Sequence, residues 1–427
     1  LLAWVVLGRR TRLMSQRLDS ATMPEFFGKR FGSKALKTGA SLIVFVFLIP
    51  YTASLYNGLS RLFGMAFGID YTVCIVIMAA LTGVYVIAGG YMATAINDFI
   101  QGLIMLGGIV AVVLAVLNEN GGFMAAMDAL ARVEDASVTT TPGAFTSFFG
   151  PAPLELLGVV ILTSLGTWGL PQMVQKFYAI RSEKAIRKGT IISTLFAVVV
   201  AGGCYFLGGF GRLYADRVDV ATDGYDAIVP AMLENLSPLL IGIVVILVLS
   251  ASMSTLSSLV MASSSTLTLD LLKDNVIKDM DEKKQVRVMR CLIVVFIAIS
   301  VIIAIVQHKS NITFIAQLMG VSWGALAGSF LAPFLYGLYW KRTTRAAVWA
   351  SFLFGSGIMT LNLLCSQIFP AALRSPINCG AFAMLAGLVI VPVVSVLTPK
   401  PDVALTDNAF ACYETTVTVP AKKSLGE

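Results

Sequence analysis

The feature that most constrains the fold of this chain is a succession of apolar runs of about 20 residues, the length that crosses the hydrocarbon core of a bilayer. Hydrophobic residues make up 57% of the 427 residues and charged residues only 13%, against about a quarter charged in an ordinary soluble domain. The chain is therefore predicted to be an all-α polytopic membrane protein with about ten full spans. The runs lie at 38–62, 71–89, 96–117, 152–175, 190–211, 238–268, 289–307, 312–339, 346–368 and 379–398.

The apolar runs stop before a polar end segment, and this division sets the domain organisation. Residues 1–398 are interpreted as one transmembrane transport domain, and residues 399–427 as a loosely ordered cytoplasmic tail. The first eight residues resemble the end of another spanning helix, so we expect the helices before it to be missing. Segment 18–31 is too short and too charged to span. Its Pro24, followed by Phe26, Phe27 and Phe31, predicts an interfacial helix.

The Lys and Arg residues alternate between loops and indicate which face lies in the cytoplasm. Eight lie in 9–37, five in 176–188, six in 271–290 and three in 341–345. The loops between these segments, 64–70, 118–150, 213–237, 308–311 and 369–378, hold at most one each. Because Lys and Arg are enriched on the cytoplasmic side of membranes, we expect the basic loops and the tail inside. This distribution explains the net charge of +7 without a nucleic-acid partner.

Residues that usually carry enzymatic or metal chemistry are scarce. The chain has one histidine, His308, and its six cysteines form no CxxC pair. The sequence therefore offers too few suitable residues for a zinc site or for histidine-based acid–base catalysis. No catalytic residue is identified, and we expect a protein that is not an enzyme. Its expected partners are the lipid bilayer and a small-molecule solute, with a monomer as the functional unit.

In the run 238–268, a strongly apolar first half is followed by a row of small and hydroxyl side chains, here called the hydroxyl ladder. Ala251, Ser254, Thr255 and Ser258 have the spacing of one helical face. Hydroxyl and carbonyl oxygens are the hard ligands that a bare alkali cation prefers. Membrane serines and threonines also bond back to the carbonyl one turn earlier or pack helices together, and this alternative stays open.

Two polar positions in the first half of the chain are further candidates. Pro50 should kink its helix, which places Tyr51 and Ser54 on a face that either lines a cavity or packs against a neighbouring helix. Asp98 is the one carboxylate entering a span in its region, and an intramembrane acid is a functional candidate by default. The pair Gly89–Gly90 should end one helix, so Asp98 could instead cap the next helix.

The run 152–175 should contain a break in its helix. Gly166, Gly169 and Pro171 interrupt an otherwise apolar sequence. In secondary transporters such interruptions unwind a helix near the middle of the membrane and mark the binding site. Trp168 is large and amphipathic enough to cover a ligand, although it could also serve packing alone.

Four stretches, in one order, carry a resemblance to a known family. They are AGGYMATAINDFIQGLIM (88–105), GTWGLPQMVQKFYAIRSEKAIRKG (166–189), SASMSTLSSLVMASSSTLTLDLL (250–272) and LAPFLYGLYWKRTTR (331–345). Together they resemble the sodium:solute symporter family, and the branch most similar is that of the pantothenate and proline permeases. The similarity extends to about residue 398.

The resemblance implies an inverted-repeat fold of five plus five helices with extra C-terminal helices, here lacking its first helices. It implies Na⁺ as the coupling ion, bound by Ser254, Thr255 and the carbonyl of Ala251. It also implies a coupling role for Asp98. Solute contacts carried over by position are Tyr51, Thr163, Gly166, Thr167 and Trp168. The remaining half of the sodium site would come from a broken helix upstream of Leu1.

The function that follows from the resemblance is sodium-coupled symport of a small organic solute by alternating access. Proline permeases carry aromatic residues where this chain has Thr163 and Thr167. That difference favours pantothenate or another small carboxylate, with proline or another amino acid as the alternative. A channel or a solute sensor on the same fold is the alternative from another class. Coupling to protons through Asp98 is a further possibility.

Overall fold

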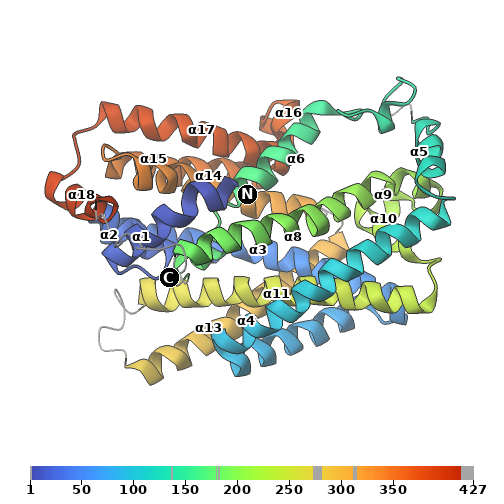
Figure 1. The fold of residues 1–427 in the computed structure, drawn as a ribbon, viewed down its shortest axis with the longest axis horizontal. Coiled ribbons are helices and arrows are strands. Elements are labelled where there is room, and N and C mark those ends of the chain that lie inside the picture. Colours follow the sequence, from blue (N-terminus) through green and yellow to red (C-terminus); the bar gives the residue numbers. More distant parts are fainter. Residues whose placement is uncertain are drawn as a thin grey trace, which may run out of the picture.

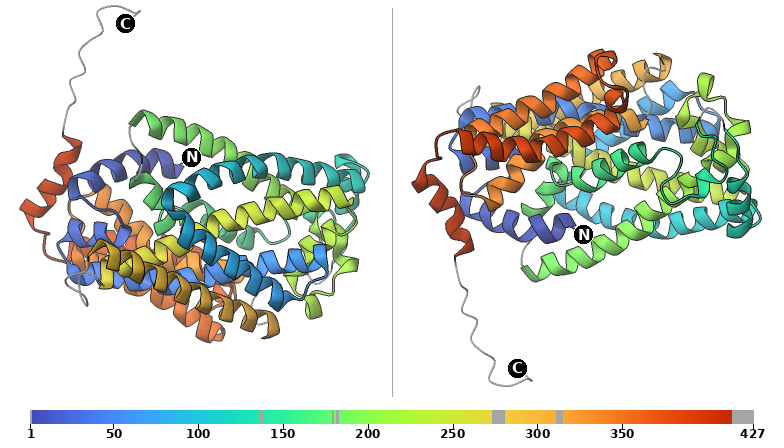
Figure 2. Two further views of the ribbon diagram at one scale, coloured as in Figure 1. Left: turned by 90° about the horizontal axis from the view of Figure 1, so that it is seen from below. Right: turned by 90° about the horizontal axis from the view of Figure 1, so that it is seen from above.

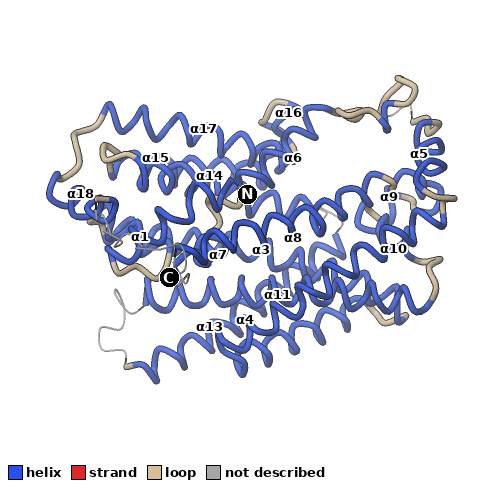
Figure 3. Tube along the Cα trace, in the orientation of Figure 1, coloured by secondary structure: helices blue, strands red, loops and turns tan. Residues whose placement is uncertain are grey.

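The computed structural model describes residues 2–135, 138–178, 180, 183–272, 281–310 and 315–414. Apart from one isolated bridge between Asp135 and Thr139, these residues form only helices, turns and loops (Figure 3). The longer helices lie roughly along one direction and form an elongated bundle (Figure 1). This arrangement agrees with the predicted all-α architecture.

The helices in chain order are η1 (Trp4–Gly8), α1 (Arg9–Leu18), α2 (Met23–Phe31), α3 (Lys34–Phe67), α4 (Tyr71–Glu119), α5 (Phe123–Ala131), η2 (Ala144–Thr146), α6 (Pro153–Gly166), α7 (Pro171–Tyr178), α8 (Glu183–Gly209), η3 (Gly211–Arg217), α9 (Val220–Asp223), η4 (Tyr225–Ala227), α10 (Ile228–Leu233), α11 (Pro238–Thr266), η5 (Leu267–Leu272), α13 (Glu282–Ser310), α14 (Ile315–Tyr339), α15 (Arg345–Cys365), η6 (Ser366–Ile368), α16 (Ala371–Arg374), α17 (Pro376–Leu397), α18 (Val403–Phe410) and η7 (Ala411–Tyr413).

Nine helical segments of the described chain are long and apolar enough to cross a membrane, and Tyr71–Ile87 is a shorter apolar helix. Each of these ten segments overlaps one predicted run, in the same order. The nine are Lys34–Phe67, Ile96–Glu119, Pro153–Tyr178, Ala185–Gly209, Pro238–Leu272, Glu282–Lys309, Ile315–Tyr339, Arg345–Ile368 and Pro376–Leu397.

Two predicted spans are joined in a way the sequence did not predict. Runs 71–89 and 96–117 belong to one element, α4, whose two arms diverge from a common end (Figures 1 and 2). Asn97 Nδ2 donates to Tyr85 Oη at 2.9 Å and thereby links the arms. Asn97 and Asp98 lie at the start of the second arm, Ile96–Glu119, and the first arm is the apolar helix Tyr71–Ile87. The expected helix end at Gly89–Gly90 lies between the two arms, at residues 88–95, outside the part of the chain that is described in detail.

The most deeply buried span is α14, which packs against α15 and α17. Of the most apolar 18 residues of this helix, 89% are buried. A Cβ atom on Gly324 would lie 2.7 Å from the Cα of Gly380, and one on Gly328 would lie 2.9 Å from the Cβ of Ala383. The Gly-x-x-x-Gly spacing of this pair therefore allows close helix packing.

The short helix α2 has the predicted start, but its aromatic face points into the protein. The Thr22 hydroxyl accepts the backbone N–H of Glu25 at 3.1 Å, which caps the helix beside Pro24. Phe27 packs edge-on against Phe352 at 5.1 Å between ring centroids. Phe26 and Phe27 are fully buried and Phe31 nearly so. These rings therefore form part of the core and are not free to enter lipid.

Candidate functional site

A kinked segment of α3 supplies the first wall of the site. Pro50 lies inside the helix and cannot donate a backbone hydrogen bond. Beside it, Thr52 Oγ1 donates to the carbonyl of Leu48 at 3.0 Å and Ser54 Oγ donates to that of Tyr51 at 2.7 Å. The Tyr51 ring stands edge-on to Trp323, with 5.7 Å between ring centroids. The Tyr51 ring therefore packs against α14.

The hydroxyl ladder lies on α11, which begins at Pro238. Ser254 Oγ and Thr255 Oγ1 each donate to the carbonyl oxygen of Ala251, at 3.0 Å in both cases. Ser258 Oγ donates to the carbonyl of Ser254, also at 3.0 Å. The two hydroxyl oxygens that point to Ala251 keep their lone pairs, because each group has used only its hydrogen. They can still accept a proton donor or coordinate a cation.

A cavity of about 470 Å³ brings most of the predicted site residues together. It lies between α3, α4, α7, α8 and α11. Its polar lining comprises Tyr51, Asp98, Gln172, Lys176, Ser254, Thr255 and Ser258, together with Ala251, and apolar residues such as Phe99, Leu103, Met173 and Phe196 complete the wall. The cavity is large enough for a small organic solute.

Two polar side chains in this cavity are buried without a partner in the described structure. Gln172 is only 4% exposed, and neither its amide oxygen nor its amide nitrogen makes a hydrogen bond within the described residues. Asp98 Oδ1 is also buried and unpaired there. An unpaired buried polar group costs about 1–3 kcal/mol. Such groups are the natural contacts for an ion or solute that enters the cavity.

Gln172 and Lys176 were not singled out from the sequence. They lie four residues apart on α7 and so share one face of that helix. Lys176 is exposed at the cavity, and its ammonium is the only positive charge among the described lining residues. The signal that could have found both residues is their position in the first turns after the helix break.

The predicted break in the run 152–175 is confirmed. The first half, α6, ends at Gly166 and the second half, α7, begins at Pro171. Between them the N–H groups of Trp168 and Gly169 bond to the carbonyls of Leu165 and Gly166, at 2.9 and 3.0 Å. A Cβ atom on Gly169 would lie 2.7 Å from the Cα of Ala327, so only glycine allows this close approach to α14.

Four residues predicted to contact solute lie outside the described lining of the cavity. Thr163 Oγ1 donates to the carbonyl of Val159 at 2.8 Å, and Thr167 Oγ1 donates to that of Ser164 at 3.3 Å. Trp168 packs against the main hydrophobic core. Gly166 faces the ring of Trp323, to which an added Cβ would come within 3.1 Å. Trp323 also contacts Tyr51, which lines the cavity. The Trp323 side chain therefore lies between the helix break and the cavity.

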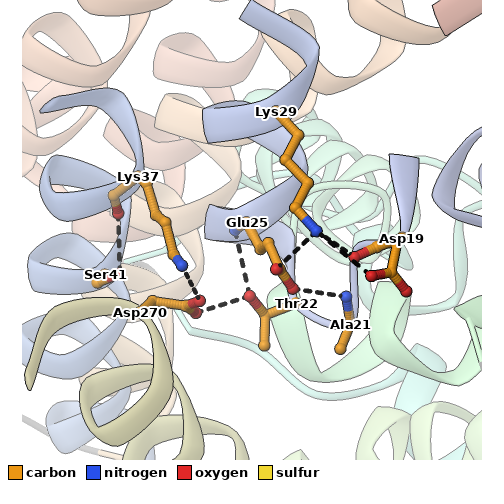
Figure 4. A network of polar contacts seen from close by, with 8 residues as sticks. All are labelled: Asp19, Ala21, Thr22, Glu25, Lys29, Lys37, Ser41 and Asp270. Carbon is orange, nitrogen blue, oxygen red and sulfur yellow. Dashed lines mark hydrogen bonds and ion pairs between the residues drawn. The ribbon is translucent and has the colours of Figure 1, made fainter. Parts of the chain in front are cut away.

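The far end of the α11 segment is held by a buried polar network (Figure 4). Asp270 lies in η5 and is 1% exposed. Its Oδ2 accepts from Thr22 Oγ1 at 2.6 Å, and its Oδ1 lies 3.2 Å from Lys37 Nζ. These contacts tie the end of the hydroxyl helix to α2 and α3. The sequence reveals an acid at the end of an apolar run, but not the partners that lie far away in the chain.

The chain is similar to bacterial sodium-coupled and osmoregulatory transporters. It is 26% identical over 402 residues to the osmoregulated proline transporter OpuE of Bacillus subtilis (strain 168), a match that covers 93% of this chain and 78% of the relative. It is 29% identical over 412 residues to a sodium/proline symporter of Staphylococcus aureus, covering 93% and 77%. Both relatives are named as transporters, in agreement with the expected transporter.

Solved structures show the same fold. A sodium-coupled sialic acid symporter in a substrate-bound, outward-open state aligns with a TM-score of 0.66 at 17% identity, covering 94% of this chain and 83% of the other. Mhp1, a nucleobase-cation-symport-1 family transporter, aligns with a TM-score of 0.51 at 13% identity, covering 96% and 86%. The predicted inverted-repeat transporter fold is confirmed.

The family follows from a match along most of the chain. The sequence profile of the sodium:solute symporter family matches residues 1–355. The predicted family, the multi-pass membrane character and the coupling to Na⁺ are thereby confirmed. The chain belongs to the sodium:solute symporter family.

Proposed function

We propose that this sodium-coupled symporter imports a small organic solute through the cavity between α3, α7 and α11, by alternating access. The supporting observation is that Ala251, Ser254 and Thr255 line the same cavity as Tyr51 and Asp98. Na⁺ binds at the hydroxyl ladder, and the solute binds beside it. Asp98 couples the two events, because its unpaired carboxylate oxygen responds to a cation nearby.

Sodium binding at this ladder requires a local exchange of hydrogen bonds. The carbonyl of Ala251 accepts two hydroxyl hydrogens, and a carbonyl oxygen has two lone pairs. To coordinate a cation through that oxygen, at least one of the hydroxyls of Ser254 and Thr255 must turn away. The exchange replaces a hydrogen bond with a stronger ion–dipole contact in a site of low dielectric constant.

Proline, or another small amino acid, is the first solute to test. The two relatives described above are named for proline, and the cavity offers both a carboxylate, Asp98, and an ammonium, Lys176. A zwitterion matches both signs, whereas pantothenate carries only a negative charge. Thr163 and Thr167 lie outside the described lining of the cavity, so they no longer favour pantothenate over proline. Together with Gly166 and Trp168, these residues remain candidate contacts for a state in which the helix break approaches the solute.

The sodium gradient is sufficient for concentrative uptake. One charge crossing about 100 mV releases about 2.3 kcal/mol. A tenfold sodium gradient adds about 1.4 kcal/mol. Together these terms support a solute gradient of roughly 500-fold for one sodium ion per solute.

The decisive experiment is uptake of labelled proline into proteoliposomes that contain the purified protein, with and without an inward Na⁺ gradient. We expect saturable, sodium-dependent accumulation, with unlabelled pantothenate and other small carboxylates present in a competition panel. Strong competition by pantothenate alone would move the solute assignment to that compound. Uptake that follows a proton gradient and ignores Na⁺ would contradict the hydroxyl site, and unitary currents without uptake would favour a channel.

The orientation and the oligomeric state are part of the same proposal. The basic loops and the tail from residue 399 face the cytoplasm, and a monomer is the transporting unit. Labelling of single cysteines placed in loops 118–150 and 341–345 of intact cells tests the first statement. Mass measurement of the purified protein in detergent, followed by reconstitution at one copy per vesicle, tests the second.

A further inference from the structure

We propose that a second cavity, formed by α2, the start of α15 and the start of α18, is a binding site for a phosphate-type oxyanion. Its volume is about 420 Å³. Its charged and hydroxyl-bearing lining residues include Arg30, Thr344, Arg345, Lys400, Asp402 and Thr406. Figure 1 shows α2 and α18 at the same end of the bundle. This site is separate from the cavity of the transport site and does not depend on the proposed solute.

Arg30 is a buried cation without a counter-ion among the described residues. It is 1% exposed, and its Nε donates to the carbonyl of Gly337 at 3.0 Å. Its Nη2 is buried and makes no hydrogen bond within that part of the chain. The guanidinium carbon lies 5.0 Å from the ring centroids of both Phe31 and Phe410. Burial lowers the pKa of Arg30 to about 10, so the side chain remains charged at neutral pH.

A buried charge that lacks a partner is strongly unfavourable, because the lost hydration is not replaced. Aromatic rings offset only part of this cost. An anion in the adjoining cavity would supply the missing charge. Natural proteins rarely keep a fully buried arginine unless something pairs with it, and this is the main reason to expect a ligand here.

The rest of the cavity is also suited to an anion. Arg345 and Lys400 add two exposed positive charges to the lining. Thr406 is 4% exposed, and its hydroxyl has no hydrogen-bond partner among the described residues. Helices α15 and α18 begin at the cavity, so their N-terminal dipoles also favour negative charge.

One carboxylate faces the same cavity and is already engaged. Asp402 Oδ1 accepts the N–H groups of Ala404 and Leu405, at 2.9 and 3.3 Å, as the N-cap of α18. The hydroxyls of Thr344 and Thr398 lie 2.7 Å apart. Three cations therefore face one carboxylate that is occupied by backbone donors. The described lining keeps a positive charge after this carboxylate is counted.

The donor set favours a phosphate group over a simple carboxylate. Guanidinium, ammonium, hydroxyl and helix N-termini approach from several directions, and a phosphate offers three or four acceptor oxygens with up to two charges. The group could belong to free phosphate or a soluble ester, or to the headgroup of an anionic lipid. The neighbouring Trp340 and Lys341 are residue types that are enriched at the membrane–water interface, so both sources can reach this end of the protein.

The test is the thermal unfolding temperature of the purified protein in detergent, titrated with two probes. One probe is inorganic phosphate, compared with chloride at equal ionic strength. The other is phosphatidylglycerol in mixed micelles, compared with phosphatidylcholine. We expect at least one anionic probe to raise the Tm of the wild-type protein by roughly 2–4 °C. A shift with phosphatidylglycerol alone identifies a lipid headgroup, and a shift with phosphate identifies a soluble anion.

In the variant R345Q/K400Q, the apparent affinity for the probe that shifts the wild-type Tm should fall at least tenfold. The matched control R374Q changes an arginine outside this cavity and should keep the wild-type affinity. Arg30→Met should abolish the shift. The Tm of this variant in phosphate-free buffer should change little, because the gain from removing a buried charge without a counter-ion offsets the lost hydrogen bond to Gly337. The proposal is overturned if neither probe shifts the wild-type protein, or if R345Q/K400Q responds like R374Q.

Discussion

Two walls of this protein use the same small residues in opposite ways. In the wall built from α14, α15 and α17, glycines contact backbone atoms, and two serine hydroxyls form hydrogen bonds from one helix to another. Ser329 Oγ donates to the carbonyl of Phe352 at 3.2 Å and Ser351 Oγ donates to that of Ser329 at 3.0 Å. In the wall built from α4, α7 and α11, the hydroxyls of Ser254 and Thr255 bond only within their own helix and face a cavity.

The difference shows what distinguishes a structural hydroxyl from one available to an ion. Residue type and helical spacing are similar in the two walls. A hydroxyl bound across to another helix is part of a fixed contact, because moving it leaves a buried acceptor unpaired. A hydroxyl that bonds back to its own helix and faces open space can exchange partners at little cost. At the cavity, the hydroxyls available to an ion lie beside other unpaired polar groups, such as the Gln172 amide.

The largest effect should come from adding one methyl group to the tightly packed wall. A Cβ atom on Gly355 would lie 2.4 Å from the carbonyl carbon of Gly328 and from the nitrogen of Ser329. Backbone atoms cannot move aside as a side chain can, so Gly355→Ala should cost about 3 kcal/mol or prevent folding. Thermal unfolding and the yield of monodisperse protein measure this loss.

The matched control lies two residues further along the same helix. A Cβ atom on Gly357 would meet nothing within 4 Å. Gly357→Ala should therefore leave stability unchanged or improve it slightly, since alanine favours the helix. Equal stability of the two alanine variants would contradict the idea that α14 and α15 are in fixed contact.

A smaller but still large loss is expected at the network that holds the end of the α11 segment. Asp270→Asn leaves Lys37 facing a neutral group in a buried position. Removing one partner of a fully buried ion pair typically costs about 3–5 kcal/mol, and the loss here should be smaller, about 2 kcal/mol, because Lys37 keeps 14% of its side chain exposed. We expect a lower Tm, and partial recovery when Lys37→Met is added, because the positive charge that has lost Asp270 is then gone. Asp407→Asn at the exposed pair with Lys341 is the control and should change little.

Features that depend on neighbouring residues could be predicted from the sequence. The lengths of the apolar runs predicted the membrane spans. Gly166, Gly169 and Pro171 predicted the helix break, because glycine and proline determine the conformation of their own backbone. The face shared by Ser254 and Thr255 follows from helical periodicity alone. Likewise, the close packing at Gly324 follows from a local pattern of small residues.

Features that depend on distant packing could not be predicted. The phenyl rings of α2 suit either a membrane surface or a protein core, and only their contacts with α14 and α15 decide between them. Thr22 and Asp270 meet across 248 positions of sequence. The solute contacts expected at Thr163 and Thr167 were carried over by position, but whether a side chain faces a cavity depends on how the two halves of the broken span are rotated.

A third prediction compares one hydroxyl from each wall. Thr255→Ala should raise the sodium concentration for half-maximal uptake at least tenfold, because it removes a proposed ligand, and should leave the Tm almost unchanged. Ser351→Ala should lower stability by about 1 kcal/mol, because it removes a buried hydrogen bond between helices, and should leave the sodium dependence unchanged. Sodium titrations of uptake and thermal unfolding of both variants measure the two responses. If each variant changed both quantities to the same extent, the distinction between the walls would be lost.

The smallest effect on stability is expected at Gln172. A substitution there also tests directly whether this cavity is the transport site. Its amide is buried without partners in the described structure, so the isosteric Gln172→Met removes a desolvation cost and should keep or slightly raise the Tm. Uptake should nevertheless fall by about tenfold or more if the amide contacts the solute or the ion, since one lost hydrogen bond of this kind is worth about 1.5 kcal/mol. Gln175→Met on the same helix, outside the described lining of the cavity, provides the control. A stable Gln172→Met variant with normal uptake would show that the unpaired amide serves neither ligand, and that the transport site lies closer to the helix break at Gly166.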